Sequence, residues 1–202
     1  MKNYLCINGK KMELTKEQMK QLGILEEKPS VTLSDDGKTA KIGDYEFIVL
    51  KKDDLSGTIE LLLKGTLGKN MAFGKNNDYR ESDVRKVVEK FGEEIEKIVG
   101  EENLLEHTVD LITMSGLKDF GSIKAKMSLL TFDKARENIE TLDEYKLDYW
   151  WWLSTAWSTK KHSIEYSTMC VSPDGDLDFN LSRCHDGGLR PFCILKSNIF
   201  KS

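Results

Sequence analysis

Short hydrophobic runs, separated by polar turn-forming residues, occupy the part of the chain that follows the first thirty residues. They lie at residues 31–33, 40–42, 45–50 and 58–63, and the segments between them contain glycine and aspartate. Side chains in a strand alternate between two faces, and β-branched and aromatic residues suit such positions. The pattern therefore predicts antiparallel hairpins over residues 31–63.

Two helical patterns follow these strands. The first runs from an N-cap at Ser82 to a stop at Gly100, with apolar residues at helical spacing: Val84, Val87, Val88, Phe91, Ile95 and Ile98. The second is expected over residues 132–139, capped by Thr131. The segment 116–126 is expected to be loop. Because the order is strands, helix, helix, strands, an α+β fold with antiparallel sheets is favoured over a doubly wound parallel sheet.

The first residues form a pattern of their own. Asn8-Gly9, a strong hairpin signal, separates two short hydrophobic runs, and Thr15 and Gln18 have the spacing of a capping box. A short helix and a proline-containing polar linker follow. The sequence predicts an N-terminal β-hairpin–helix appendage at residues 1–28 and a main domain at residues 31–202.

Composition excludes several kinds of partner. The chain has 202 residues with 30 basic and 34 acidic side chains, mixed along its length, so no nucleic-acid partner is expected. No apolar run approaches the roughly 20 residues of a membrane span, and no signal peptide is recognised. We therefore expect a cytoplasmic protein without a membrane partner, with its four cysteines as free thiols. No cofactor is expected, and the oligomeric state is left open.

The richest segment lies near the C-terminus, between Tyr149 and Leu195. All four tryptophans lie in it, three of them consecutive at residues 150–152. In a strand, Trp150 and Trp152 would face one side and Trp151 the other. We expect one of these faces to lie in the core and the other to be covered, or open as an aromatic platform.

Two short motifs in this segment resemble those of a bacterial and phage domain family of unknown function. Trp151-Trp152-Leu153-Ser154 resembles its Trp-Trp-Leu-Arg-Ser signature, and Gly188-Leu189-Arg190-Pro191 resembles its Gly-Val-Arg-Pro strand. Residues 169–171, 173–175 and 177–179 match the strand, turn and strand that lie between them. The family's arginine and proline are Ser154 and Ala156 here, so no role of that arginine is transferred.

This family is similar to C-type-lectin-like folds, which include formylglycine-generating enzymes and retroelement-diversified binding proteins. The resemblance implies an α+β domain in which two helices flank small antiparallel sheets and a loop-rich C-terminal half displays a ligand surface. It also implies a buried structural role for Arg190, with anion binding as the alternative. The signature residues are Trp151, Trp152, Leu153, Arg190 and Pro191. We expect the tryptophan triplet and the Arg-Pro strand to lie side by side in a single antiparallel sheet.

The resemblance implies that binding residues lie in the polar segment between the two signatures. The candidates are Trp157, Lys160, His162, Tyr166, Asn180, Arg183, His185 and Asp186. Rigid aromatic rings combined with adaptable polar side chains are typical of recognition surfaces. The alternative that these are ordinary loop residues stays open.

Metal sites and catalytic sites have weaker signals. A calcium loop would use the alternating oxygen ligands Asp174, Asp176, Asp178 and Asn180, but its closing glutamate is missing, and the solvent face of a hairpin is favoured. A zinc site would use Cys170, Cys184, His185 and Cys193, but no Cys-x-x-Cys pair occurs. His107 and His162 are isolated and are expected to be exposed or to cap helices. No catalytic residue and no metal ligand is assigned.

Three functions are compatible with these observations. The first is a non-enzymatic recognition module that binds a protein or glycan partner through its C-terminal loops. The second is an intracellular phage effector that inhibits a host protein by occlusion. The third is a small redox or oxidase-like enzyme, which would need a pocket containing a perturbed cysteine or histidine.

Overall fold

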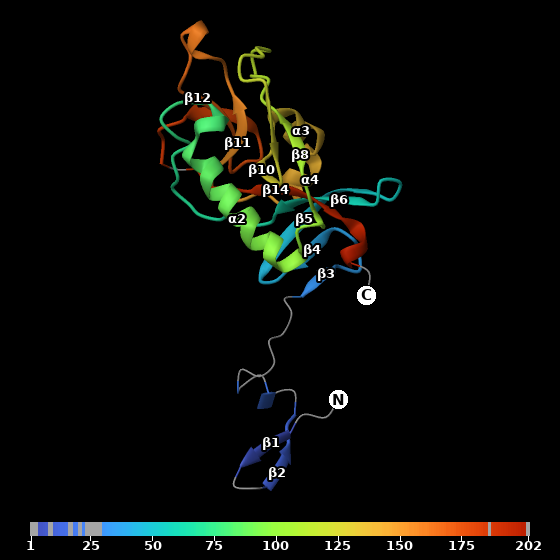
Figure 1. Cartoon of the computed structure of the whole chain (residues 1–202). Helices are drawn as coiled ribbons and strands as arrows, with labels where there is room; N and C mark the ends of the chain where they lie inside the picture. Colours follow the sequence, from blue (N-terminus) through green and yellow to red (C-terminus); the bar gives the residue numbers. More distant parts are fainter. Residues whose placement is uncertain are drawn as a thin grey trace.

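The computed structural model describes residues 4–7, 10–15, 18–19, 22, 30–185 and 187–200. Asn8-Gly9, the linker residues 26–29 and the candidate Asp186 lie outside the described residues. Within the described part, the chain is a mixed α+β protein with several antiparallel sheets and few helices (Figure 1). None of the described helices has the length and apolar character needed to cross a membrane.

The predicted N-terminal hairpin is confirmed. Strands β1 (Tyr4–Ile7) and β2 (Lys10–Glu13) pair antiparallel in a sheet of their own. The capping box is also present: the Gln18 backbone N–H donates to Thr15 Oγ1 at 3.2 Å, and the Thr15 backbone N–H donates to Gln18 Oε1 at 3.0 Å. The division into an appendage and a main domain stays a prediction.

The main sheet has seven strands and is larger than the small sheets that the resemblance implied. Its strand order is β10-β14-β6-β5-β4-β3, β7 also pairs with β14, and every pair is antiparallel. The strands are β3 (Val31–Leu33), β4 (Thr39–Ile42), β5 (Tyr45–Asp53), β6 (Thr58–Leu63), β7 (Leu104–Leu105), β10 (Met127–Leu129) and β14 (Pro191–Lys196). The hairpins predicted for residues 31–63 are therefore confirmed.

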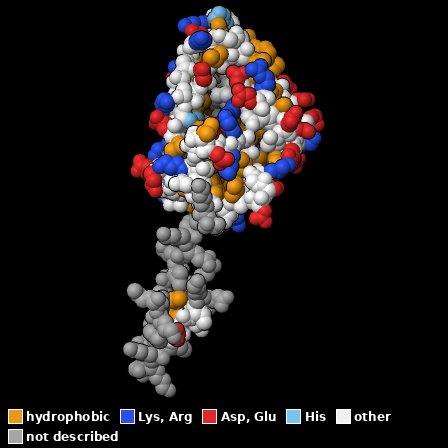
Figure 2. Space-filling view, turned by 90° about the vertical axis from the view of Figure 1, so that its right-hand side faces the viewer, with side chains coloured by type: hydrophobic (Ala, Val, Ile, Leu, Met, Phe, Trp, Pro, Cys, Tyr) orange, Lys and Arg blue, Asp and Glu red, His pale blue; other side chains and the backbone are white. Residues whose placement is uncertain are grey.

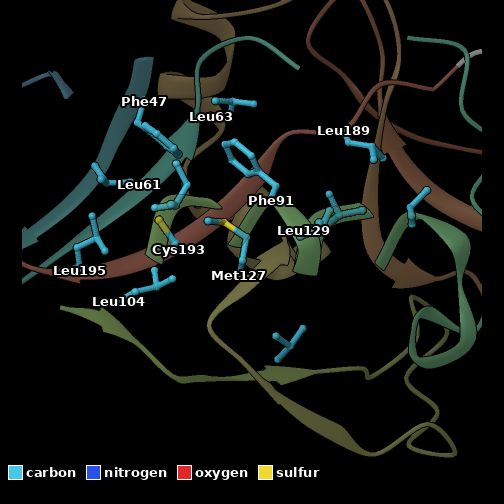
Figure 3. Close-up of a cluster of buried hydrophobic side chains, with 14 of the residues drawn as sticks. Phe47, Leu61, Leu63, Phe91, Leu104, Met127, Leu129, Leu189, Cys193 and Leu195 are labelled. Carbon is cyan, nitrogen blue, oxygen red and sulfur yellow. The ribbon is translucent and has the colours of Figure 1, made fainter. Parts of the chain in front are cut away.

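Helix α2 (Asp83–Val99) covers one face of this sheet, after a short 3-10 turn at η1 (Tyr79–Glu81). Ser82 Oγ accepts a hydrogen bond from the Arg85 backbone N–H at 3.2 Å, and Gly100 ends the helix with φ 90°, as predicted. Between α2 and the sheet lies a first core, in which side chains from α2, β10 and β14 converge with those of β5 and β6 (Figure 3).

The opposite face of the sheet is covered by two short helices where the sequence predicted one. α3 (Phe132–Glu137) and α4 (Ile139–Glu144) are separated at Asn138. The Asn138 side chain donates to the Lys134 carbonyl at 2.8 Å, which diverts that carbonyl from the helical ladder. The predicted cap is present, since Thr131 Oγ1 accepts from the Lys134 backbone N–H at 3.2 Å. A second core lies beneath α3 and α4 and includes Ile48, Leu62, Leu142, Trp151 and Met169.

The remaining strands form two smaller sheets. β8 (His107–Asp110) pairs with β9 (Ser122–Ala125), which lies in a segment expected to be loop. β11 (Trp151–Ala156), β12 (Ser167–Val171) and β13 (Leu177–Leu181) form a three-stranded sheet. The chain ends its described part with η3 (Ser197–Phe200).

Two projecting segments lie together at one end of the molecule. The β8–β9 connection and the segment containing η2 (Lys160–His162) both rise at the top of Figure 1. Asp119 joins them, because its carboxylate accepts from Thr159 Oγ1 and from Lys161 Nζ, each at 2.9 Å. These contacts hold the predicted display segment against a second loop.

The expectation that the tryptophan triplet and the Arg-Pro strand share one sheet is wrong. β11 belongs to the three-stranded sheet, whereas β14 lies inside the seven-stranded sheet. Their backbones are joined at Gly188, whose N–H donates to the Trp150 carbonyl at 2.7 Å and whose carbonyl accepts from the Trp152 N–H at 3.1 Å. This bridge is parallel. From Pro191 onward the chain pairs with β10, and from Phe192 onward also with β6, so β14 belongs to the seven-stranded sheet.

Candidate functional site

The tryptophan triplet is part of the protein interior. Trp152 and Trp150 pack on the first core and Trp151 on the second, as strand alternation predicts. All six residues of β11, including the signature residue Leu153, are buried. Both faces of the strand are therefore covered, and the triplet does not form an open aromatic platform.

Arg190 is completely buried beside the triplet. Its Nε donates to the Leu63 carbonyl at 3.0 Å, and its Nη2 donates to the Lys64 carbonyl at 3.1 Å. The guanidinium carbon lies 4.9 Å from the centre of the Trp151 ring, a cation–π contact. Burial lowers the pKa of Arg190 to about 10, so the side chain stays charged at neutral pH. These contacts place Arg190 in the protein interior, where it connects the start of β14 to the end of β6, and the buried Pro191 pairs opposite Leu129 of β10.

The three-stranded sheet is only partly covered on its α3 side. On that face Val171 lies opposite Leu177 and Met169 lies opposite Phe179. Leu177 packs on the second core, but Phe179 and Leu181, further along β13, have 48% and 55% of their surface exposed. The sheet face therefore continues beyond its helical cover.

The candidate Trp157 joins these exposed residues. Its ring centre lies 4.8 Å from that of Phe179, with a tilted geometry. Its backbone N–H donates to the Ser167 carbonyl, and Ser167 lies opposite Leu181. We name Trp157, Phe179 and Leu181 the aromatic patch. Sequence reasoning missed Phe179 and Leu181, although the apolar residues at 177, 179 and 181 alternate with polar ones at 178 and 180.

Tyr166 and Arg183 form a separate pair. The Arg183 guanidinium carbon lies 4.5 Å from the centre of the Tyr166 ring, and Arg183 Nε donates to the Lys75 carbonyl at 3.4 Å. By strand alternation, Tyr166 lies on the side of β12 opposite to Met169. The pair therefore lies on the other side of the sheet from the aromatic patch.

Of the other candidates, His185 lines a shallow pocket together with Arg183, and the rest lie elsewhere or outside the described residues. Lys160 and His162 are exposed in η2, and Lys160 Nζ lies 3.6 Å from Glu165 Oε2. His185 is exposed, Asn180 is partly buried, and Asp186 lies outside the described residues. The seven described candidates therefore occupy two faces and a projecting turn, and they do not share one pocket.

The alternative metal sites find little support. Asp174, Asp176 and Asp178 are exposed on the β12–β13 hairpin. Across the described residues, no group of three or more His, Cys, Asp or Glu side chains could hold a metal ion. Burial raises the pKa of the Cys193 thiol to about 12, which keeps that thiol protonated and unreactive.

A cavity of about 400 Å³ lies elsewhere, between β8, α3 and the main sheet. His107, expected to be exposed or capping, lines this cavity instead and is partly buried. Its Nε2 lies 2.9 Å from Ser128 Oγ, and its ring meets Phe192 edge-to-face at 5.2 Å. Burial lowers the pKa of His107 below its ordinary value of 6.5. No local sequence signal indicates this arrangement, because Ser128 and Phe192 come from distant strands.

The surface on this side of the molecule has no strong electrostatic character. Figure 2 views the protein from the right-hand side of Figure 1 and shows acidic and basic side chains interspersed, with hydrophobic atoms between them. Such a surface offers no extended basic area of the kind that nucleic acids require.

The comparison with known families gives one match. Residues 110–197 match a family described as a domain of unknown function (DUF6273). The match covers less than half of the chain, but it includes β11, β12, β13 and β14 and agrees with the predicted membership of a domain family of unknown function. No curated protein and no solved structure matches the chain.

Proposed function

We propose that this protein is a non-enzymatic recognition module that binds a protein partner through the aromatic patch. The observation that carries the proposal is the exposure of Phe179 and Leu181 on a regular strand, beside the Trp157 ring. Contiguous exposed apolar side chains on a soluble domain mark interaction sites, because leaving them in water is unfavourable.

The side chains of the patch are already ordered before a partner binds. Its side chains stand on strand β13 and at the end of β11, so their backbones are held by the sheet before a partner arrives. The contact between the Trp157 and Phe179 rings also restricts their rotamers. Less conformational entropy is therefore lost on association, and aromatic anchors of this kind contribute much of the binding energy in protein interfaces.

A protein is favoured over a glycan as the partner. Leu181 extends the two aromatic rings with an aliphatic side chain that a protein's apolar side chains would cover. A glycan would need several hydrogen-bonding groups around the rings, and the three side chains of the patch offer only the indole N–H. A glycan partner remains the alternative that binding assays would detect.

The proposal can be tested with a matched pair of substitutions. Leu181→Asp places a charge in the patch, whereas Leu55→Asp makes the same change at the β5–β6 turn, where the leucine is fully exposed. The full chain and both variants would capture partners from lysate, and the affinity for each purified candidate would be measured by calorimetry. We expect Leu181→Asp to weaken binding at least about tenfold and Leu55→Asp to leave it unchanged. Equal affinities for all three proteins would reject the aromatic patch.

Three related expectations belong to this proposal. Occlusion of a host protein by the same face is the form that an intracellular phage effector would take. A C-type-lectin-like fold is supported by the small three-stranded sheet beside a larger one and by the long segment between β11 and β12, and an experimental structure would test it.

The oxidase-like alternative needs a reactive thiol. The two candidate thiols differ in exposure, because Cys193 is buried and Cys184 is partly exposed.

A further inference from the structure

We infer that the cavity between β8, α3 and the main sheet is a binding site for a small hydrophobic molecule with a neutral hydroxyl head group. This inference is independent of the proposed function. Trp157, Phe179 and Leu181 do not line the cavity, and a ligand inside it would not contact the aromatic patch.

The cavity has the size and composition of a ligand site. Its floor is the second-core face of the main sheet, with Phe192 and Ile194 of β14 exposed to it, and Phe132 of α3 forms part of the opposite wall. Its volume of about 400 Å³ lies within the range of pockets that hold small molecules. These apolar walls would accept the hydrophobic body of a ligand.

One corner of the cavity is polar. Ser128 of β10 and His107 of β8 both line it, and their contact uses His107 Nε2. The other ring nitrogen, Nδ1, is buried and makes no well-formed hydrogen bond within the described residues, although the Leu105 carbonyl lies near enough to raise the pKa of the ring. Because an unsatisfied buried nitrogen is unfavourable, a ligand that reaches the ring with a hydrogen-bonding group would gain affinity.

The buried charges around this corner are already paired. Glu60 Oε2 and Lys134 Nζ, which both line the cavity, lie 2.6 Å apart. Asp133 and Arg136, further along α3, are paired at 3.0 Å. Asp110, the other charged side chain of the lining, is exposed to water. A charged head group in the buried corner would therefore lose its hydration without a buried opposite charge to compensate it, so a neutral head group is favoured.

The chemistry of the imidazole selects a hydroxyl among neutral head groups. Burial favours the uncharged ring, in which one nitrogen carries a proton and donates a hydrogen bond while the other nitrogen accepts a hydrogen bond. The Ser128 hydroxyl can donate to Nε2 or accept from it, so the ring can adopt either tautomer and Nδ1 can be the donor or the acceptor. A hydroxyl both donates and accepts, and it can therefore satisfy Nδ1 of His107 in either tautomer.

Three probes with the same ring and different head groups test this inference. Benzyl alcohol is neutral, benzoate is anionic and benzylamine is cationic near neutral pH. Each would be titrated into the full chain labelled with ¹⁵N-histidine, and the ring nitrogens would be followed by long-range ¹H–¹⁵N spectra. The chain has three histidines, so the signal lost in His107→Gln assigns His107. We expect benzyl alcohol to shift Nδ1 of His107 saturably and to bind at least about tenfold more tightly than the charged probes.

Two variants and one control complete the experiment. His107→Gln should weaken benzyl alcohol binding about tenfold, as measured by ligand-observed NMR. Met114→Trp, at the cavity rim where the methionine is 42% exposed, should narrow the entrance and weaken binding even if His107→Gln fails to fold. Phe179→Ala, in the aromatic patch, should leave binding unchanged. The inference is overturned if no probe gives a saturable shift, if a charged probe binds as tightly as benzyl alcohol, or if Met114→Trp binds like the wild type.

Discussion

Replacement of Arg190 by alanine is expected to destabilise the protein severely. The substitution removes the hydrogen bonds to the Leu63 and Lys64 carbonyls and the contact with the Trp151 ring. Hydrogen bonds to a charged group contribute about 1.5–3 kcal/mol each, and both carbonyls lose a partner at the end of β6. An empty space the size of the lost side chain adds a further cost.

Part of this loss is offset. The guanidinium is buried without a carboxylate partner among the described residues, and its Nη1 has no hydrogen-bond partner there. Removing a poorly compensated buried charge returns several kcal/mol. We therefore expect Arg190→Ala to lower the free energy of unfolding by about 3 kcal/mol, a large share of the 5–15 kcal/mol typical of a domain.

Two further substitutions separate the contributions. Arg190→Met keeps most of the volume and removes the buried charge, so it should cost about half as much as Arg190→Ala. Arg190→Lys keeps the charge but cannot reach two carbonyls with a planar fork, so it should cost more than Arg190→Met. Urea unfolding with a constant slope would measure all three.

An Arg190→Ala protein that unfolds at the same urea concentration as the wild type would show that the carbonyl contacts do not stabilise the fold. An Arg190→Lys protein more stable than Arg190→Met would show that burying the charge costs less than one donor to the carbonyls contributes, which contradicts the estimate above.

Three other predictions concern buried positions. Gly92→Ala, usually favourable within a helix, should destabilise by about 1–3 kcal/mol in urea unfolding, because a Cβ would lie 2.9 Å from Met127 Cβ. Burial holds the pKa of His107 below 6.5, so as the pH falls the unfolded chain binds a proton before the folded chain does. The neutral His107 therefore contributes to stability above about pH 6.5, and this contribution is lost as the pH falls. His107→Gln should make the free energy of unfolding less dependent on pH between about pH 7 and 5. A thiol reagent should label Cys184 before Cys193, whose pKa of about 12 keeps it protonated, and mass spectrometry would identify the order.

Local patterns predicted most of the first hundred described residues. The hairpins from β3 to β6 and helix α2 follow directly from alternation, helical spacing and the caps at Ser82 and Gly100. These signals are contained within one element, so neighbours in the sequence suffice to determine them. The break at Asn138 was missed because the competing hydrogen bond of its side chain is not visible in an apolar pattern.

Long-range pairing could not be predicted in the same way. The sequence of a strand shows its own alternation but does not identify the strand with which it pairs. The prediction therefore placed the Arg-Pro strand in the wrong sheet. His107 illustrates the same limit, because its environment depends on Ser128 and Phe192 from other strands. Phe179 and Leu181 are different. Their alternation was available in the sequence, and what was missing was the knowledge that the helical cover ends before them.

The position of β14 determines when the seven-stranded sheet can finish folding during synthesis. Strand β14 lies between β10 and β6, although it follows β6 by more than a hundred residues in the chain. Until residues 191–196 have left the ribosome, β6 and β10 both present unpaired edges, and the apolar side chains that face β14 are open to water. Such a nascent chain would complete its fold late, with these edges open to association until then.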